Sequence, residues 1–189
     1  MLGPPVSAGV SGQSMRVLAA FFLILVATLA AAGGPVLPAG WRYPTKEELG
    51  REPLRHQSPN GFSVASGDFN GDGVPDAAYV LMSTTSSGEG LLVRLSRPEH
   101  QFEWLVLRTM QLDGSRALFG PEMGVHTISP GRHQFLCIAV APNCQVPDGE
   151  RKVVVTQLPS IEYFKFESAS QMFVWNKQMR QFDVFPLSD

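Results

Sequence analysis

The sequence has little charge of either sign and few residues suited to covalent or metal chemistry. Its 189 residues include 15 Lys and Arg, 17 Asp and Glu, 4 His and 2 Cys, and the formal net charge is -2. Because no block of like charge and no broad basic field is present, nucleic acid is excluded as the expected partner. The chain also lacks a Gly-x-x-x-x-Gly-Lys phosphate loop. Its length predicts one domain with a core large enough to fold alone.

Cysteine is scarce, and the positions of the two cysteines favour an exported protein. Cys137 and Cys144 are seven positions apart, and in an oxidising compartment we expect them to form a disulfide that closes a small loop. Such a bond contributes about 2 kcal/mol of stability. Two free thiols are the alternative, which exported proteins tend to avoid. A metal-binding pair lacks a further Cys or a nearby His to complete a zinc site.

A long uncharged run near the N-terminus predicts a targeting segment. Arg16 precedes an apolar stretch over residues 17–32 that ends in three alanines, which is typical of a signal peptide with a cleavage site. We predict a signal peptide over residues 1–32, with Met15 as an alternative start. An uncleaved membrane anchor is the other interpretation, although the run is shorter than the roughly 20 residues that a span needs. We therefore expect a periplasmic or secreted protein.

The predicted domain organisation follows from this leader. Residues 33–44 are expected to be a linker, and residues 45–189 a single β-rich domain. Membrane contact is expected only through the N-terminal segment, if that segment is not cleaved. No Cys directly follows the apolar run, so lipid attachment there is not expected.

An oxygen-rich loop over residues 68–76 indicates a specific chemistry. It reads Asp-Phe-Asn-Gly-Asp-Gly-Val-Pro-Asp. Calcium is a hard cation that takes six to eight oxygen ligands, and carboxylates this close repel one another unless a cation is bound. We therefore predict a Ca²⁺ site whose ligands occupy the odd-numbered positions of the loop: the side chains of Asp68, Asn70, Asp72 and Asp76, and the backbone carbonyl of Val74.

The flanks of the loop predict two strands rather than two helices. Alternating apolar residues stand on both sides of the loop, a pattern that favours strand, loop and strand. Gly71 and Gly73 are expected to take positive φ, so that the odd-numbered positions face one centre. Tyr79 stands where an EF-hand has its bidentate Glu, which excludes that motif. A plain hairpin turn rich in Asn, Asp and Gly, without a metal, is the alternative.

The segment from Val64 to Val80 resembles the calcium-loop hairpin of FG-GAP repeats, which are of the integrin α-propeller-like or VCBS type. The resemblance covers about 30 residues if the next strand is included. It implies a structural calcium ion between two strands, held by the five positions named above. Propellers repeat this loop in several blades of about 40–50 residues, whereas this chain has one copy. The arrangement of leader, single loop and aromatic tail also resembles a group of small exported bacterial proteins without an established activity.

The rest of the chain predicts a mainly β or α+β fold with an antiparallel sheet, and not a complete propeller. Thr45 to Glu48 has the pattern of a capping box that opens a short helix ending near Gly50. Residues 84–90 are expected to be a turn, and residues 176–180 a hairpin connection. Further strands are predicted at 91–95, 102–109, 123–128, 134–140, 153–157, 161–166, 172–175 and 181–185. In the second of these, one face is expected to carry Phe102, Trp104, Val106 and Arg108.

Candidate catalytic groups are weak. The four histidines, His56, His100, His126 and His133, share no ligand spacing. Glu162 and Glu167 are candidate paired acids, although carboxylates at strand edges are usually solvated. The favoured function is a non-enzymatic, calcium-stabilised exported domain that binds an unidentified protein or envelope component. A small secreted or periplasmic hydrolase with unrecognised catalytic residues is the alternative.

Overall fold

The computed structural model describes residues 35–113, 120–137 and 151–188. The predicted signal peptide and Cys144 lie outside these ranges. The helices are α1 (Lys46–Gly50) and two short 3-10 helices, η1 (Pro53–Gln57) and η2 (Pro98–His100). The strands are β1 (Trp41–Arg42), β2 (Val64–Gly67), β3 (Asp76–Ser83), β4 (Gly88–Ser96), β5 (Phe102–Gln111), β6 (Met123–Ile128), β7 (Gly131–Leu136), β8 (Arg151–Thr156), β9 (Ser160–Lys165), β10 (Ser170–Asn176) and β11 (Gln181–Ser188).

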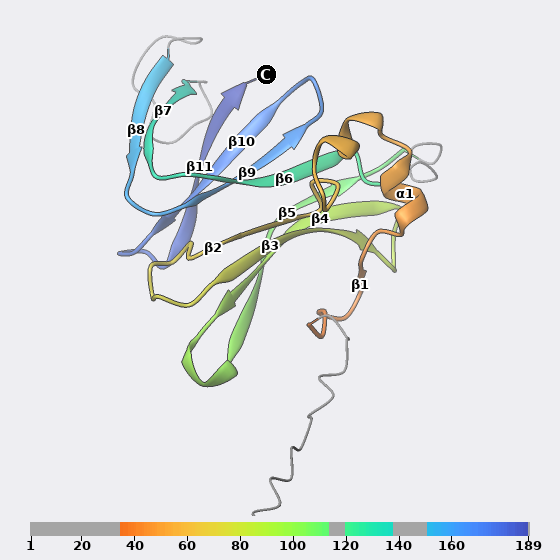
Figure 1. Cartoon of the computed structure of the whole chain (residues 1–189), viewed down its shortest axis with the longest axis horizontal. Coiled ribbons are helices and arrows are strands. Elements are labelled where there is room, and N and C mark those ends of the chain that lie inside the picture. The colour runs from red at the N-terminus through yellow and green to blue at the C-terminus, as the bar shows by residue number, and fades with distance from the viewer. Residues whose placement is uncertain (1–34, 114–119, 138–150, 189) are drawn as a thin grey trace, which may run out of the picture. The chain divides into compact units, whose positions relative to one another are not determined.

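Two antiparallel sheets carry most of the described strands (Figure 1). A five-stranded sheet has the order β1-β3-β4-β5, with β2 also paired to β3, and a four-stranded sheet has the order β11-β10-β9-β6. β7 and β8 form a separate hairpin, and Phe135 of β7 packs edge-on against Phe185 of β11. The prediction of a mainly β, antiparallel fold that is not a propeller is confirmed.

The core lies between the two sheets because both inner faces are apolar. Its fully buried members come from both sheets: Ala65, Phe69, Ala78, Val80, Leu91, Val93, Leu95, Val125, Ile161, Tyr163 and Phe173. The outer face of β3 and β4 is also buried, because Leu37, Trp41, Val64 and Trp104 cover it. Burial on both faces explains why β3 and β4 consist of nearly continuous apolar residues.

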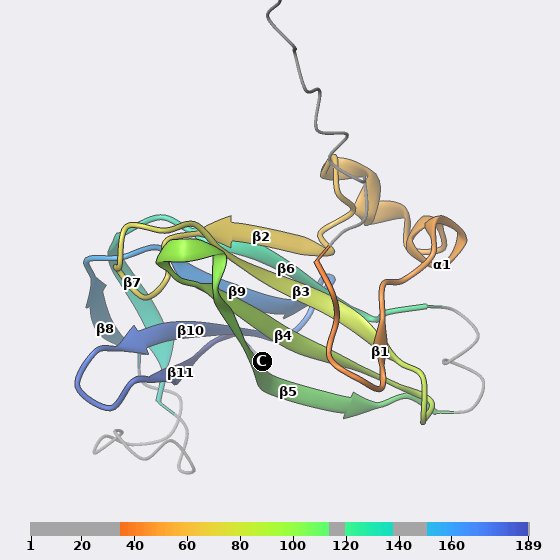
Figure 2. The ribbon, with the colours of Figure 1, turned by 90° about the horizontal axis from the view of Figure 1, so that it is seen from below.

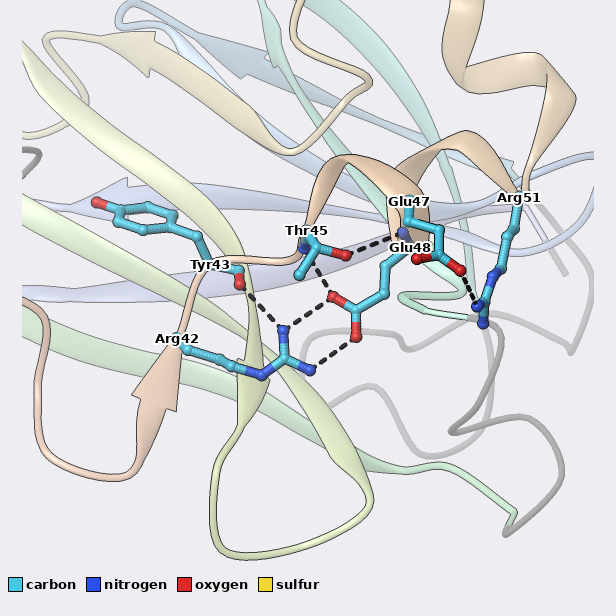
Figure 3. A network of polar contacts seen from close by, with 6 residues as sticks. All are labelled: Arg42, Tyr43, Thr45, Glu47, Glu48 and Arg51. Carbon is cyan, nitrogen blue, oxygen red and sulfur yellow. Dashed lines mark hydrogen bonds and ion pairs between the residues drawn. The ribbon is translucent and has the colours of Figure 1, made fainter.

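Helix α1 begins as the sequence predicts. The Thr45 side chain accepts a hydrogen bond from the backbone N–H of Glu48, and the Glu48 carboxylate accepts one from the backbone N–H of Thr45. The predicted capping box is therefore confirmed. Arg42 of β1 donates two hydrogen bonds to the same carboxylate, at 2.8 and 2.7 Å (Figure 3). Trp41 and Arg42 also pair with β3, so part of the predicted linker belongs to the sheet.

β4 begins earlier than the sequence predicts. The predicted turn over residues 84–90 is wrong at its C-terminal end, because Gly88, Glu89 and Gly90 pair with β5. A Cβ at Gly90 would lie 2.7 Å from the Trp41 ring and 2.8 Å from the carbonyl oxygen of Arg108. Glycine inside a strand marks such a close approach. Glu89 is therefore a strand residue, on the same face as Leu91 because side chains alternate with a period of two.

A β-bulge in β5 changes which residues share a face. Leu92 pairs with Val106 but Leu91 pairs with Arg108, so Leu107 is the extra residue on β5. Because paired residues lie on the same face, Arg108 turns to the inner face together with the core residue Leu91. The prediction that Arg108 shares a face with Val106 is therefore wrong, since the extra residue shifts the alternation by one.

The later strands follow the sequence pattern more closely. The strand predicted at 123–128 coincides with β6, and residues 177–180 connect β10 to β11 as expected. The strand predicted at 134–140 corresponds to β7, which begins three residues earlier, at Gly131. Its last predicted residues, 138–140, lie outside the described ranges.

The two sheets meet along one side through β2 and β6 (Figure 2). The backbone N–H of Val125 donates to the carbonyl of Phe62 at 2.8 Å, and the Thr127 hydroxyl donates to the carbonyl of Ser66 at 2.8 Å. On the other side, β5 approaches β10 through side chains, with Arg108 Nε donating to Gln171 Oε1 at 3.3 Å. Among the described strands, no backbone pairing joins the two sheets on the β5 side, where Leu105 and Leu107 pack against the core.

Candidate functional site

The predicted calcium loop is the connection of a β-hairpin. β2 and β3 pair in antiparallel register up to Gly67 and Asp76, so residues 68–75 leave and re-enter the sheet at neighbouring positions. Gly71 and Gly73 have φ of 74° and 85°, a left-handed region that glycine adopts without steric cost. The predicted strand–loop–strand arrangement and the positive φ at both glycines are confirmed.

The carboxylate of Asp68 organises the loop backbone. It accepts hydrogen bonds from the backbone N–H groups of Gly71, Asp72 and Gly73, at 2.7, 3.1 and 2.9 Å. Successive backbone N–H groups directed at one anion form a concave anion site. The loop backbone is therefore curled around its first residue.

Asn70 and Asp72 lie together on the exposed side of the loop. Asn70 Oδ1 accepts a hydrogen bond from the backbone N–H of Asp72 at 2.9 Å, and Asn70 Nδ2 donates to Asp72 Oδ2 at 3.2 Å. Asp72 Oδ1 accepts from the backbone N–H of Val74 at 2.8 Å. Three of the predicted positions, Asp68, Asn70 and Asp72, are thus joined in one network of hydrogen bonds.

Asp76 connects the loop to β4 through hydrogen bonds. Its side chain is buried, and its carboxylate accepts hydrogen bonds from the backbone N–H groups of Phe69, Asn70 and Ser96 at 3.0, 3.4 and 2.8 Å. Ser96 is the last residue of β4. Burial raises the pKa of Asp76 above its ordinary value, although the three N–H donors partly oppose this rise. The sequence pattern did not indicate this structural contact with β4.

The oxygen atoms of the loop match the chemistry that calcium prefers. In the described residues, no group of three or more His, Cys, Asp or Glu side chains is close enough to hold a metal ion. A carboxylate can accept hydrogen bonds or bind a cation at about four lone-pair positions. Asp68 and Asp76 each accept three hydrogen bonds, which leaves about one position for a cation on each. Asp72 accepts two hydrogen bonds, which leaves about two positions. The other atoms of the loop that could coordinate a metal are the Asn70 Oδ1 atom and backbone carbonyl oxygens. All of the possible ligands are therefore oxygen atoms, and this set fits a hard cation.

The loop borders a cleft that is lined by side chains of both charges. A Cβ at Gly71 would lie 2.9 Å from Leu158 and 3.0 Å from Lys177 Nζ, so the loop packs against two turns of the second sheet. A cleft of about 630 Å³ opens beside it and is lined in part by Asn70, Asp72, Arg97, Trp175, Lys177 and Arg180. In the part of the chain that the structure describes, Lys177 and Arg180 make no ion pair.

A buried acid that the sequence analysis missed lies at the opposite end of β4. Glu89 is 1% exposed, and its carboxylate accepts hydrogen bonds from the backbone N–H groups of Glu122 and Met123 at 2.8 and 3.0 Å. Burial raises the pKa of Glu89 to about 7, although these donors and the positive charge of Arg55 oppose the rise. Its spacing of two residues from Leu91 and four from Val93 was the signal that could have placed it on the inner face.

Arg55 provides the positive charge near this acid. It is 2% exposed, and its guanidinium donates to the carbonyl groups of Gly61, Pro121 and Met123, each at 2.7 Å. It also lies over the Phe166 ring, 4.9 Å from the ring centre. These contacts tie η1 to the segment before β6, which is the same segment that binds Glu89.

The two predicted candidate acids, Glu162 and Glu167, have different surroundings. His126 Nε2 is 3.0 Å from Glu162 Oε2; burial alone would raise the pKa of Glu162, but the hydrogen bond and charge of His126 lower it below its ordinary value. Ser170 also lowers the pKa of this carboxylate, and the Ser170 hydroxyl lies 3.1 Å from that of Ser188. An acyl-transfer triad instead needs a hydrogen bond between the serine hydroxyl and the imidazole. Glu167 is an exposed turn residue with φ of 56°.

The remaining predicted groups show no further constellation. His56 is exposed on η1, and His133 Nε2 lies 3.1 Å from the carbonyl oxygen of Ser129. Cys137 is fully buried directly after β7; because Cys144 lies outside the described residues, their pairing stays a prediction. Among the residues that can be described, no helix is long and apolar enough to span a membrane.

Comparison with known proteins adds no relative. No family model matches the chain. Searches of the curated proteins and of the solved structures likewise give no significant match. The resemblance of residues 64–80 to an FG-GAP hairpin therefore stays a prediction from the sequence, and the argument about function rests on the geometry above.

Proposed function

We propose that this chain is an exported β domain that a calcium ion stabilises, and that it binds a protein or envelope component without catalysing a reaction. The observation that carries the proposal is the β2–β3 loop, where hydrogen bonds join Asp68, Asn70 and Asp72 and leave acceptor positions on all of them. Asp68, Asn70, Asp72 and Asp76 and the carbonyl of Val74 would hold the ion. The ion would supply positive charge that offsets the repulsion among the three carboxylates.

The expected role of the ion is structural. A ligand that binds only the folded state stabilises it by RT ln(1 + [L]/Kd), which is about 2.7 kcal/mol at a free concentration about 100-fold above Kd. Asp76 already joins the loop to Ser96 of β4, so order in the loop is coupled to order in the sheet. Calcium binding would therefore be detected as a change in the stability of the whole domain.

A binding role is favoured over hydrolysis by the contacts of the candidate acids. His126 pairs with Glu162 and the Ser170 hydroxyl lies 3.1 Å from that of Ser188, so among the described residues this serine and this histidine form no hydrogen bond. The cleft beside the loop instead is lined by charged side chains of both signs, among them Asp72, Lys177 and Arg180. Such a surface suits electrostatic recognition of a charged partner. Export is supported by the apolar segment over residues 17–32.

The first prediction is that Asp72→Ala removes the stabilisation by calcium. The wild-type domain should gain about 2.7 kcal/mol between chelator and calcium at about 100 times Kd, whereas the variant should gain much less, because it loses the carboxylate with the most unused acceptor positions. Thermal unfolding of both proteins, in chelator and in calcium, measures the difference.

Asp113→Ala is the matched control, because Asp113 is an exposed aspartate outside the loop. It should keep the full response to calcium. Equal losses of stability for Asp72→Ala in chelator and in calcium would refute the metal site. A wild-type protein that shows no heat of calcium binding in titration calorimetry would refute it independently.

A further inference from the structure

The bulge in β5 places an exposed cation, Arg108, on the sheet face that fronts the second sheet. Without the extra residue Leu107, the alternation of β5 would leave Arg108 on the outer face with Val106. With it, the guanidinium lies 5.9 Å from the centre of the Phe173 ring of β10, and Nε donates to Gln171. Its two terminal nitrogens make no hydrogen bond in the described part of the chain. Bulges of this kind re-aim side chains next to functional sites.

A surface pocket opens beside Arg108, at the edge where β5 faces β10. Its volume is about 310 Å³, at the lower end of the range for small-molecule sites. It is lined by Arg108, Thr109, Met110, Met123, Tyr163, Ala169 and Gln171. The lining comes from β5, β6, β9, β10 and the turn before β10. Methionine side chains adapt readily to apolar ligands of different shape.

A buried hydroxyl in this pocket needs a partner. Tyr163 is 4% exposed, and its hydroxyl lies close to the Glu89 carboxylate, although no hydrogen bond of standard geometry joins the two groups. Burial, followed by the charge and the hydrogen-bonding capacity of Glu89, raises the pKa of this phenol, while the charge of Arg108 opposes the rise. The hydroxyl therefore stays protonated. It can donate a hydrogen bond to an acceptor in the pocket that offers better geometry than Glu89 does.

We propose that this pocket binds a small carboxylate with an apolar body. The carboxylate would accept hydrogen bonds from the terminal nitrogens of Arg108, which suit two-point binding of a carboxylate, and from the Tyr163 hydroxyl. The apolar body would contact the side chains of Met110 and Met123. Glu89 does not oppose such an anion strongly, because its oxygens already accept two backbone N–H groups and Arg55 lies close to it.

The pocket is separate from the calcium loop. Asp76 of the loop binds Ser96 at the last residue of β4, whereas Glu89 is the second residue of the same strand. The two sites therefore lie toward opposite ends of β4. Binding to the pocket is expected in the presence of chelator as well as calcium, so the pocket and the calcium site can fail independently.

The experiment is a titration of the domain with hexanoate, followed by NMR of methyl-labelled methionine. The methyl signals of Met110 and Met123 should shift with saturation, and that of Met179, in the turn between β10 and β11, should not. Acetate carries the charge without the apolar body and should bind more weakly, and hexanol carries the body without the charge and should not saturate. Acetate therefore tests the contact with Arg108 alone, and hexanol tests the contact with the methionines alone.

Two variants separate the site from non-specific binding. Arg108→Gln should weaken hexanoate about 10- to 100-fold, the usual loss for a hydrogen bond to a charged group, and Tyr163→Phe should weaken it by about tenfold or less. Arg132→Gln, an exposed arginine of β7, is the control and should bind like wild type. The proposal is overturned if hexanoate does not saturate, if other methionines shift instead, or if Arg108→Gln binds as well as Arg132→Gln.

Discussion

At the scale of single residues, the loop contains two glycines whose backbones look alike but whose surroundings differ. Gly71 and Gly73 both have positive φ. A Cβ at Gly71 would lie 2.9 Å from Leu158 and 3.0 Å from Lys177, whereas a Cβ at Gly73 would meet nothing within 4 Å. The sequence predicts the backbone requirement at both positions. It does not predict that only one of them is packed against the second sheet.

The second prediction uses this difference. Gly71→Ala and Gly73→Ala should both destabilise the domain, because alanine is strained at positive φ by about 1 kcal/mol. Gly71→Ala should cost roughly 1 kcal/mol more, since Leu158 and Lys177 must move. Urea unfolding of the two variants measures the difference in the free energy of unfolding. If both variants lose the same stability, the loop does not pack against Leu158 in solution.

At the scale of elements, side-chain contacts near the first turn stabilise α1, because the helix is too short to be stable alone. It has only five residues. Arg42 and Thr45 both bind the carboxylate of Glu48. The hydrogen bond from Arg42 is the largest cause that lowers the pKa of Glu48 to about 2. One carboxylate therefore connects the helix cap with β1.

The third prediction concerns this carboxylate. Glu48→Gln should lower the free energy of unfolding by about 1–2 kcal/mol at neutral pH, because the charge-assisted pair with Arg42 is lost, while Gln still accepts the capping-box hydrogen bond from Thr45. Because the folded state lowers the pKa of Glu48 from 4.5 to about 2, its contribution is complete above about pH 5. The difference between wild type and variant should shrink as the pH falls toward 2.

Glu47→Gln is the matched control for the helix. Glu47 pairs with Arg51 at 2.8 Å, but its side chain is 80% exposed, so the substitution should change stability by a few tenths of a kcal/mol at most. Chemical unfolding over a series of acidic pH values measures both variants. An unchanged gap between wild type and Glu48→Gln at pH 7 and near pH 2 would contradict the role of the ion pair.

The bulge shows why the position of a strand in the sequence is easier to predict than the sheet face on which each of its side chains lies. Strand β5 is recognisable from the sequence, and its observed bounds, Phe102–Gln111, contain the predicted range. The extra residue Leu107 has no sequence signal that distinguishes it from its neighbours. It is identified only by the pairing of Leu91 with Arg108. A one-residue shift moves every later side chain to the other face, so the position of Arg108 depends on the pairing of β5 with β4.

At the scale of the whole molecule, buried polar groups lie toward both ends of β4. Glu89, Arg55 and Tyr163 are buried at one end and Asp76 at the other, and the apolar core lies between the two sheets. The folded state holds the proton of Glu89 more tightly than the unfolded chain does, since burial raises its pKa from 4.5 to about 7. Folding is thus coupled to pH through this end of the core.

The fourth prediction is that stability falls as the pH rises from about 5 to 8. A raised pKa of an acid means that the native state binds more protons than the unfolded state over this range, and the loss reaches about 3 kcal/mol at most. Glu89→Gln should remove most of this slope. The raised pKa of Asp76 gives a slope of the same sign, so the comparison of the variant with wild type isolates Glu89.

Urea midpoints measured across this range provide the data for the pH prediction. Glu103→Gln is the control, because Glu103 is a partly exposed acid paired with Arg97 at 2.6 Å. It should leave the slope unchanged. If the free energies of unfolding of wild type and Glu89→Gln change in parallel with pH, the pKa of Glu89 does not differ between the folded and unfolded states, and the prediction is wrong.

The sequence by itself determined the features that depend on neighbouring residues. The capping box at Thr45, the strand–loop–strand over residues 64–80 and the positive φ of its two glycines all follow from local steric and hydrogen-bonding preferences. Only the tertiary structure decided that Asp76 binds Ser96 and that Arg108 meets Tyr163 beside Glu89. These groups are far apart along the chain, and strand pairing, one bulge and the packing of two sheets bring them together.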